Sequence, residues 1–270
     1  MLLINILINF LFIYSDAFIL MPNNNIKYNT NIKYNKNIKS SYYSDYSYKR
    51  ENIKNKNIPI VIQGNSLRTW SYNSPNIDKV QITLSSNGRP LDSDIELWNG
   101  PDNAPFKMRV YNENGATSHF NAIIDTPRGP NTVAIKNIGQ IEFPVLANVF
   151  TEKILTPSQE VFNEKYTIQG GALKTYSFHP HVDSVEIFLH TDGRPLNSRI
   201  ELLQGPNNNK QVIELYTDNG DERSFFCILE TPGSGNVVRI VNTAPLEFPL
   251  YTGVLPYSIN YKLENNINFE

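Results

Sequence analysis

Cysteine is nearly absent from this sequence, since Cys227 is the one cysteine among 270 residues. A single thiol excludes an intrachain disulfide and a cysteine metal cluster, and we expect Cys227 to be a small buried apolar residue. An excess of either charge is also missing, because the formal net charge is only −2. Without a basic surplus, the charge gives no indication of a nucleic-acid partner. Tryptophan (2) and methionine (3) are scarce beside tyrosine (15) and phenylalanine (14), a balance that favours strands over helical bundles.

The patterns of common catalytic and cofactor sites are missing as well. The sequence has no glycine-rich phosphate loop and no dinucleotide-binding fingerprint. A hydrolytic site needs a nucleophile, a base and an orienting group together. His179 and His181 in "HPH" have no evident third metal ligand nearby, so we interpret them as a solvated loop. In "DNGDE" (218–222) the glycine and the glutamate are misplaced for a calcium loop, and we expect a hairpin turn. We predict no catalytic residue, no cofactor, no metal site and no enzymatic activity.

The start of the chain has the composition of a targeting segment. Residues 2–14 form an apolar run interrupted only by Asn5 and Asn9, although the usual preceding positive charge is missing. The run is too short to span a bilayer comfortably, so we interpret residues 1–17 as a signal-peptide-like segment and expect no membrane contact of the mature protein. A buried strand or an interfacial helix is the alternative.

Residues 18–57 resemble the second part of a plastid address. Up to Ser44 this stretch contains four lysines and no acidic residue among many asparagines, tyrosines and serines. Such a segment buries too little apolar surface to offset its chain entropy, and we expect it to be disordered and transit-peptide-like. The junction "SDAF" resembles the Ala-Phe cleavage motif of algae with plastids of red-algal origin, although Asp16 and the absence of Ala-Pro after Phe18 depart from it.

The remainder of the chain contains one unit twice. The phrase "GRPLDSDIELWNGP" (88–101) returns as "GRPLNSRIELLQGP" (193–206), and "IQGNSLRTWSY" (62–72) returns as "IQGGALKTYSF" (168–178). The offset changes from 106 to 105 because one residue is lost between Tyr72 and Ile77. We interpret this as an internal duplication. The expected organisation is a repeat unit at 58–150, a linker at 151–159, a second unit at 160–254 and a tail at 255–270.

Each copy has the periodicity of β-strands. "VQITL" (80–84) and "VEIFL" (185–189) alternate, which places Val80, Ile82 and Leu84 on one face. Turn signals recur every eight to fifteen residues, and neither copy contains a helical run of ten residues. The sequence therefore predicts an all-β protein made of two tandem β-sandwich or jelly-roll-like units. The one helix candidate is "TPSQEVFNEK" (156–165), where Ser158 is suited to cap a turn or two.

The duplicated phrase has a structural interpretation. Glycine after Asn or Asp favours a tight hairpin turn with positive φ, proline fixes the exit from the turn, and Gly-Pro ends the following strand. We expect the two arginines to bind loop carbonyls or a carboxylate such as Glu96 or Glu201, with ligand binding as the alternative. "EFP" (142–144 and 247–249) suggests a closing edge strand in each copy. The structural motif residues are Gly88, Arg89, Pro90, Gly100, Pro101, Gly193, Arg194, Pro195, Gly205 and Pro206.

The repeats resemble a known family. "IELWNGPDNAPFKMRVYNENG" (95–115), "TPRGPNTVAIKNIGQIEFP" (126–144) and their second copies are similar to the pyrenoid shell proteins (PyShell) of diatoms and related algae. The resemblance covers residues 58 to about 254. It implies a structural protein without catalytic residues that assembles into a sheet around the Rubisco condensate in the chloroplast stroma and supports CO2 concentration. The implied partners are copies of itself, related shell proteins and, on one face, the Rubisco condensate.

Differences between the copies suggest where the protein associates. Four outward positions are polar in the first copy (Thr83, Asn121, Thr132 and Lys136) and apolar in the second (Phe188, Phe226, Val237 and Val241). A patch of this kind is unusual on a monomer, so we expect another subunit, the first unit or the tail to cover it. "YSINYKL" alternates through Tyr257, Ile259 and Tyr261, which predicts strand addition to an edge of its own or of a neighbour.

Two other functions fit a duplicated β unit. A carbohydrate- or protein-binding module would have a shallow groove lined by aromatic residues such as Trp70 and Trp98. A plastid enzyme would have a deep pocket with converging polar groups.

Overall fold

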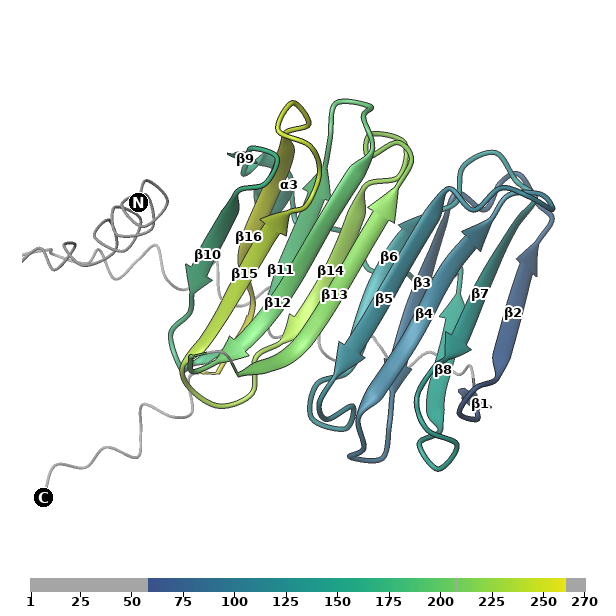
Figure 1. Cartoon of the computed structure of the whole chain (residues 1–270), viewed down its shortest axis with the longest axis horizontal. Coiled ribbons are helices and arrows are strands. Elements are labelled where there is room, and N and C mark those ends of the chain that lie inside the picture. Colours follow the sequence, from purple (N-terminus) through teal and green to yellow (C-terminus); the bar gives the residue numbers. More distant parts are fainter. Residues whose placement is uncertain (1–57, 207, 261–270) are drawn as a thin grey trace, which may run out of the picture. The chain divides into compact units, whose positions relative to one another are not determined.

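The protein is described by a computed structural model that covers residues 58–206 and 208–260. The expectations for the leader, Tyr261 and the rest of the tail lie outside these residues. The described chain forms two eight-stranded sheets with almost no helix, so the predicted all-β class is confirmed (Figure 1). Among the described residues, no helix combines the length and the apolar character that crossing a membrane requires.

Both sheets are antiparallel at every pairing between neighbouring strands. Sheet A contains, in spatial order, β1 (Ile60–Ile62), β8 (Val145–Phe150), β3 (Lys79–Ser85), β6 (Phe120–Asp125), β14 (Phe225–Glu230), β11 (Val182–His190), β16 (Leu250–Ile259) and β9 (Tyr166–Ile168). Sheet B contains β10 (Leu173–Ser177), β15 (Asn236–Asn242), β12 (Leu196–Gln204), β13 (Asn209–Thr217), β5 (Phe106–Asn112), β4 (Leu91–Trp98), β7 (Asn131–Asn137) and β2 (Leu67–Tyr72).

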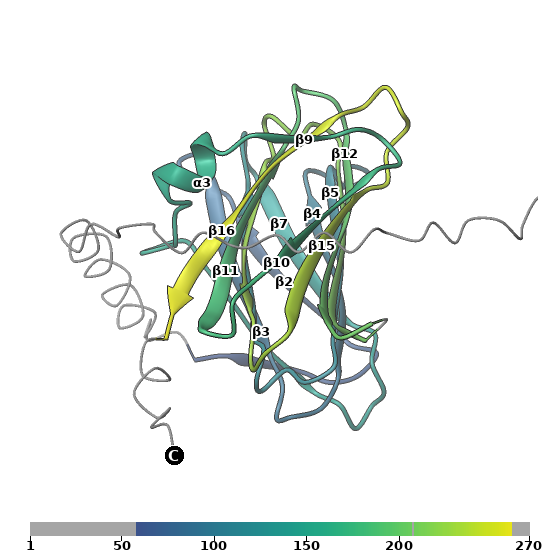
Figure 2. The same cartoon turned by 90° about the vertical axis from the view of Figure 1, so that its left-hand side faces the viewer.

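The two sheets pack face to face as the layers of a β-sandwich-like fold (Figure 2). Alternation along each strand sends one set of side chains into the space between the layers. Val80, Ile82 and Leu84 are fully buried there, as their pattern predicts. Cys227 is a buried free thiol in the same core, and burial raises its pKa.

The two halves of the chain have the same strand order, and their sheets are joined. The first half supplies β1-β8-β3-β6 to sheet A, and the second supplies β9-β16-β11-β14. Between the halves, β6 pairs with β14 in sheet A and β5 pairs with β13 in sheet B. A single hydrophobic cluster therefore includes residues of both halves. The sequence predicts two tandem units; whether each half folds alone stays a prediction.

The register at this junction relates equivalent residues. Cys227 lies opposite Ala122, and Glu214 lies opposite Arg109. In both pairs the two numbers differ by 105, which is the offset between the copies. The halves thus meet about an approximate two-fold axis that passes through both sheets.

The turns of the duplicated phrase differ in part from the prediction. Gly88 and Gly193 have φ of 76° and 93°, and Gly100 and Gly205 have φ of 84° and 86°, so positive φ is confirmed. The first two glycines do not form hairpins, however, because β3 and β4 belong to different sheets, as do β11 and β12. They turn the chain from one layer to the other. The "DNGDE" segment likewise connects β13 with β14 across the layers.

Arg89 and Arg194 lie in these connections between the layers and contact the "EFP" turns. Each guanidinium lies 5.6 Å from the ring centroid of the phenylalanine in "EFP", Phe143 and Phe248 respectively. Arg194 also donates to the carbonyl oxygen of Glu247. A loop carbonyl thus binds Arg194, as expected. Glu96 and Glu201 are not the partners of these arginines, because their carboxylates accept from other residues. "EFP" is not an edge strand either, since it lies in the turn before β8 or β16.

The segment 151–165, called the linker from here on, contains the predicted helix. α3 (Gln159–Asn163) begins at Ser158, whose Oγ accepts from the Val161 amide at 3.1 Å. Two equivalent buried side chains on the outer face of sheet A hold the linker. Gln81 Oε1 accepts from the Leu155 amide at 2.9 Å, and Glu186 accepts from the amide and the hydroxyl of Ser158 at 3.1 and 2.5 Å.

Candidate assembly surfaces

The sheets end in four edge strands. At the end formed by the first half, called the first end, β1 and β2 are the outermost strands; at the second end they are β9 and β10 (Figure 1). An edge strand presents backbone amides and carbonyls that can pair with another chain. The two ends are therefore the candidate surfaces for assembly.

Exposed apolar side chains gather at these ends in equivalent positions. Leu67 and Leu173 begin β2 and β10 and are 44% and 55% exposed. Ile141 and Leu246 are 69% and 74% exposed at the tips of the turns that pack against Gly64 and Gly170. A Cβ on either glycine would lie within 2.2 Å of a backbone oxygen of that turn, so the position requires glycine. Further exposed apolar residues at the ends are Ile58, Ile60, Val61 and Tyr166.

Each sheet B edge strand carries a cation and an aromatic ring on its inward side. Arg68 and Trp70 on β2 pair with the buried Ile135 and Val133. Lys174 and Tyr176 are their equivalents on β10. Lys174 Nζ lies 4.3 Å from the ring centroid of Tyr166 and 5.9 Å from that of Tyr176. Burial raises the pKa of Tyr176 to about 12.

The outer face of sheet B carries a row of alternating charges, called the charge row here. Cross-strand pairing places these side chains in sequence from the second end to the first: Leu173, Val241, Arg199, Glu214, Arg109, Asp94, Lys136 and Leu67. An open groove of about 590 Å3 lies along its middle, and its charged lining residues include Glu96 and Lys107. Neither Trp70 nor Trp98 lines this groove.

Ion pairs connect side chains of this face, both within β12 and between neighbouring strands. Glu201 is almost fully buried and accepts from Arg199 Nε at 2.7 Å and from Arg239 Nε. Burial raises its pKa, but the bonds from Arg239 and Arg199 outweigh burial and hold the pKa below its usual value. Arg109 binds Asp92 at 3.0 Å, and this hydrogen bond raises the pKa of Arg109. The face is thus polar but internally paired.

On the outer face of sheet A, the linker covers the second half. Phe188 and Phe226 are 6% and 3% exposed and pack in a small cluster with Val161 of α3. The ring centroids of Phe162 and Phe188 are 5.3 Å apart. Their outward direction is as predicted, but the cover is α3 of the same chain. Tyr257 of the predicted tail and Ile123 of the first half belong to the same cluster, and both belong to the segments expected to cover these residues. A contact of Phe188 and Phe226 with another subunit stays a prediction.

Gly253 lets the linker approach so closely. A Cβ at this position would lie 2.1 Å from the carbonyl oxygen of Val161. Its equivalent in the first half is Asn148, and Thr83 and Asn121 stand where the second half has Phe188 and Phe226. The linker therefore packs on the second half, where the outer face of sheet A has apolar side chains and a glycine, and the first half has polar residues at these positions.

Val237 and Val241 lie elsewhere. Both are half-buried on β15, on the outer face of sheet B beside β10. The four residues therefore do not form one patch, because two lie on sheet A and two on sheet B. Strand alternation predicts which way a side chain points, but it does not predict to which sheet the strand belongs.

Two of the three predicted tail residues are described. β16 continues through Tyr257 and Ile259, and the last residues pair with β11, so the tail joins an edge of its own chain here. Tyr257 is 7% exposed. Its pKa is raised to about 12, mainly by burial and to a smaller extent by the negative charge of Glu186.

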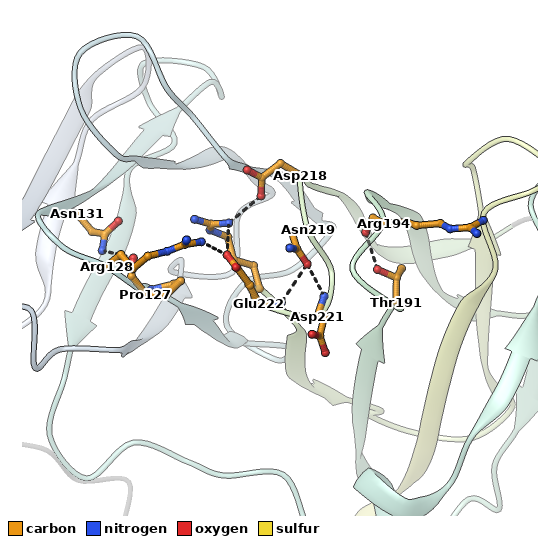
Figure 3. Close-up of polar contacts among 10 residues, drawn as sticks. Pro127, Arg128, Asn131, Thr191, Arg194, Asp218, Asn219, Asp221 and Glu222 are labelled. Carbon is orange, nitrogen blue, oxygen red and sulfur yellow. Dashed lines mark hydrogen bonds and ion pairs between the residues drawn. The ribbon is translucent and has the colours of Figure 1, made fainter.

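Loops at the junction carry a polar cluster between the halves (Figure 3). Arg128 of the first half binds Glu222 of the second. Arg223 is 4% exposed and binds Asp218 at 2.8 Å. A separate cavity of about 370 Å3 is lined by Asn112, Ser118, Lys210 and Asn236 among others. Within residues 58–206 and 208–260, no cluster of three metal-ligating side chains occurs.

The edge position of β2 and β10 in sheet B was not predicted from the sequence. The signal was present in "LRTWSY" and "LKTYS", which alternate an outward leucine with an inward cation and ring in both copies. Assigning these segments to edges required the sheet order, which the alternation does not contain.

These features define an all-β protein whose unusual surfaces are sheet edges and internally paired faces. The chain belongs to the family described as Diatom pyrenoid shell protein, which matches residues 54–256. Membership implies association with the chloroplast pyrenoid and is consistent with a structural role.

Two solved structures are similar to the chain at low sequence identity. No curated protein matches the chain. The PBSX exported protein XepA is 10% identical with a TM-score of 0.23, covering 73% of this chain and 84% of its own. Oxalate decarboxylase from Bacillus subtilis is 7% identical with a TM-score of 0.16, covering 76% and 77%. Neither likeness carries an argument.

Proposed function

We propose that this protein is a non-catalytic structural protein that self-assembles into a sheet at the periphery of the Rubisco-containing pyrenoid, in the chloroplast stroma. By enclosing the condensate, the sheet supports CO2 concentration and carbon fixation. Copies of the chain are the main partners, together with related shell proteins and the Rubisco condensate on one face.

The observation that carries this proposal is the pair of open ends. Both sheets end in strands that have no further partner among the described residues, and exposed apolar side chains lie beside them at equivalent positions. A chain with a binding edge at each end can join two neighbours. Contacts that do not close into a ring produce extended arrays.

The proposed targeting rests on the leader composition and on family membership. A reporter fused to residues 1–57 should enter the plastid, and retention in the cytosol would refute the targeting role. A fluorescent fusion of the full chain should mark the rim of the pyrenoid. A diffuse stromal signal would contradict the shell role.

Assembly is tested directly with the purified full chain. Electron microscopy should show sheets or tubes, and sedimentation should show large species at micromolar concentration. A monodisperse monomer under all conditions would overturn the proposal. For the alternative of a carbohydrate-binding module, the groove on sheet B offers one aromatic residue, Tyr216, and neither Trp70 nor Trp98.

A further inference from the structure

We propose that sheet B continues from one copy of the chain into the next through an antiparallel joint between β2 and β10 of the neighbour, with Thr69 opposite Thr175. This inference rests on the proposed function and names the edges that assembly uses. The partner is a second copy of this chain.

Strand direction permits the joint without turning the neighbour over. Neighbouring strands of sheet B are antiparallel throughout, so the first and the last of its eight strands run in opposite directions. A second copy in the same orientation therefore presents β10 antiparallel to β2. Repetition keeps every sheet B on one side of the layer. This suits a shell, which separates two different surroundings.

Strand length and side-chain pattern define the register. β2 has six residues and β10 has five. Placing Thr69 opposite Thr175 pairs all five residues of β10 with β2 and preserves the inward and outward directions of both strands. The resulting cross-strand pairs are Leu67 with Ser177, Arg68 with Tyr176, Thr69 with Thr175, Trp70 with Lys174, and Ser71 with Leu173.

The inward pairs are complementary in charge and shape. Arg68 meets the ring of Tyr176, and Lys174 meets the ring of Trp70. A cation over an aromatic ring is favourable, most of all over tryptophan. Lys174 already lies over the Tyr166 ring within its own chain, which shows that this edge positions its ammonium against aromatic faces. The outward pairs would cover part of Leu67 and Leu173, which are exposed in the single chain.

The same cations make the edge selective. An inward-pointing charge on an edge strand disfavours pairing with a strand that leaves the charge buried and unpaired. A partner strand must supply an aromatic ring opposite each cation. β10 does so for β2, and β2 does so for β10.

Sheet B is the better edge for such a joint. β1 and β9, the edges of sheet A, have only three residues each. Three residues give few backbone bonds and a poorly defined register. The five-residue overlap in sheet B can define both.

The equivalence of the ends also creates the competing arrangement. β2 could pair with β2 of a reversed copy, which would place Thr69 opposite Thr69 and turn alternate copies over. The two arrangements are distinguished by which positions approach each other. Paired residues of an antiparallel joint have Cα atoms about 4.5–5.5 Å apart, a distance that a disulfide can bridge.

Cysteine cross-linking of the full chain tests the joint. Thr69→Cys and Thr175→Cys are made singly and mixed in equal amounts under assembly conditions, followed by mild oxidation. The buried Cys227 is shielded from reaction. The mixture should form a disulfide-linked dimer, whereas each single variant alone should stay monomeric on a non-reducing gel. The double variant should form a ladder of linked multimers. Thr69→Cys with Ser177→Cys, two residues out of register, is the control and should cross-link far less.

The other outcomes overturn the joint in distinguishable ways. Dimers from a single variant alone would show that like edges pair. Sheets of normal appearance without any cross-link would refute the joint while the proposed function stands. Absence of assemblies from the unmodified chain would remove the proposed function and this inference together.

Discussion

Arg109 and Glu214 occupy equivalent positions in the two halves, and they lie directly opposite each other on β5 and β13. At an approximate two-fold axis, identical halves would place like charges face to face, which destabilises a strand pair. The next equivalent positions, Asp94 and Arg199, are also opposite in sign. The difference between the equivalent residues therefore gives an alternating charge row where like charges would repel.

The charge row predicts that exchanging the charges of Arg109 and Glu214 lowers stability, even though the two side chains stay opposite in sign. Arg109→Glu removes the ion pair with Asp92 and places a carboxylate beside it. The new carboxylate also lies opposite Glu214 and Asp94, so the free energy of unfolding should fall by about 0.5–2 kcal/mol. Adding Glu214→Arg restores an attraction between positions 109 and 214, but it replaces the ion pair of Glu214 with Arg199 by two facing arginines. The new glutamate still lies beside Asp92 and Asp94. The double variant should therefore be about as unstable as the single one. Urea denaturation of both variants, at low and high salt, measures this.

An isolated ion pair would behave differently. If the double variant regained the stability of the unmodified chain, the neighbours in the row would contribute nothing, and the two residues would form a simple pair. Added salt should reduce the losses, because the side chains of this face are partly exposed.

The buried carboxylate of Glu201 predicts an acid-sensitive contribution to stability. Its pKa is lowered in the folded chain, so the bonds to Arg239 and Arg199 stabilise the fold above the unfolded pKa near 4.5. That contribution is lost as the pH falls through the lower folded value. Glu201→Gln should cost about 1.5–3 kcal/mol at pH 7. The difference from the unmodified chain should shrink below about pH 4.5.

The first half offers a matched control for this variant. Glu96 is the equivalent of Glu201, but it accepts from the indole of Trp98 at 2.7 Å. A glutamine there can still accept that bond, so Glu96→Gln should cost less at pH 7. Equal losses of unfolding free energy from both substitutions would show that the bonds from Arg199 and Arg239 give Glu201 no extra stabilising effect over Glu96. Chemical denaturation between pH 3 and 8 gives both comparisons.

Local sequence signals predicted the strands, several glycine turns and the helix cap. Alternation identified Val80, Ile82 and Leu84 as core residues, and Ser158 caps α3 as expected. These features depend on neighbours in the sequence, which explains why a short pattern reveals them. The outward direction of Phe188 and Phe226 follows from the same alternation.

Long-range pairing could not be predicted in this way. The sequence around Gly88 predicts a hairpin turn. The same local signal occurs whether the next strand pairs with the preceding one or crosses to the other sheet. The cover over Phe188 depends on Gln81 and Glu186 holding the linker from strands distant in sequence. The positions of β2 and β10 at the edges likewise depend on the order of all eight strands in sheet B.

Restoring first-half residues should have different effects on the two faces. Phe188→Thr with Phe226→Asn removes two buried rings beneath α3, and should lower the free energy of unfolding by at least about 3–5 kcal/mol. Val237→Thr with Val241→Lys is the matched pair on sheet B. Both valines are half-exposed, so the loss should be below about 1 kcal/mol. Equal losses in thermal denaturation would contradict the burial of the two phenylalanines by the linker.

The bond between Glu186 and the linker should depend on an acceptor oxygen rather than on charge. Glu186→Ala leaves the amide and hydroxyl of Ser158 without this partner, and should cost about 1–3 kcal/mol. Glu186→Gln keeps an acceptor oxygen, as Gln81 does for Leu155 in the first half, and should cost clearly less. Hydrogen exchange of the Val161 amide should report the loosening of α3 in the alanine variant. Similar protection in both variants would contradict this bond.

Two truncations separate the structural and the assembly roles of the tail. Deleting residues 256–270 removes the end of β16, including Tyr257, which is 7% exposed in the cluster beneath α3. This deletion should lower the melting temperature by several degrees, because those contacts are lost. Deleting only residues 261–270 keeps those contacts and should leave the melting temperature unchanged. If Tyr261 and its neighbours extend the strand pattern onto another copy, the shorter deletion should still impair sheet formation in electron microscopy. Normal sheets from that variant would exclude the last ten residues from assembly.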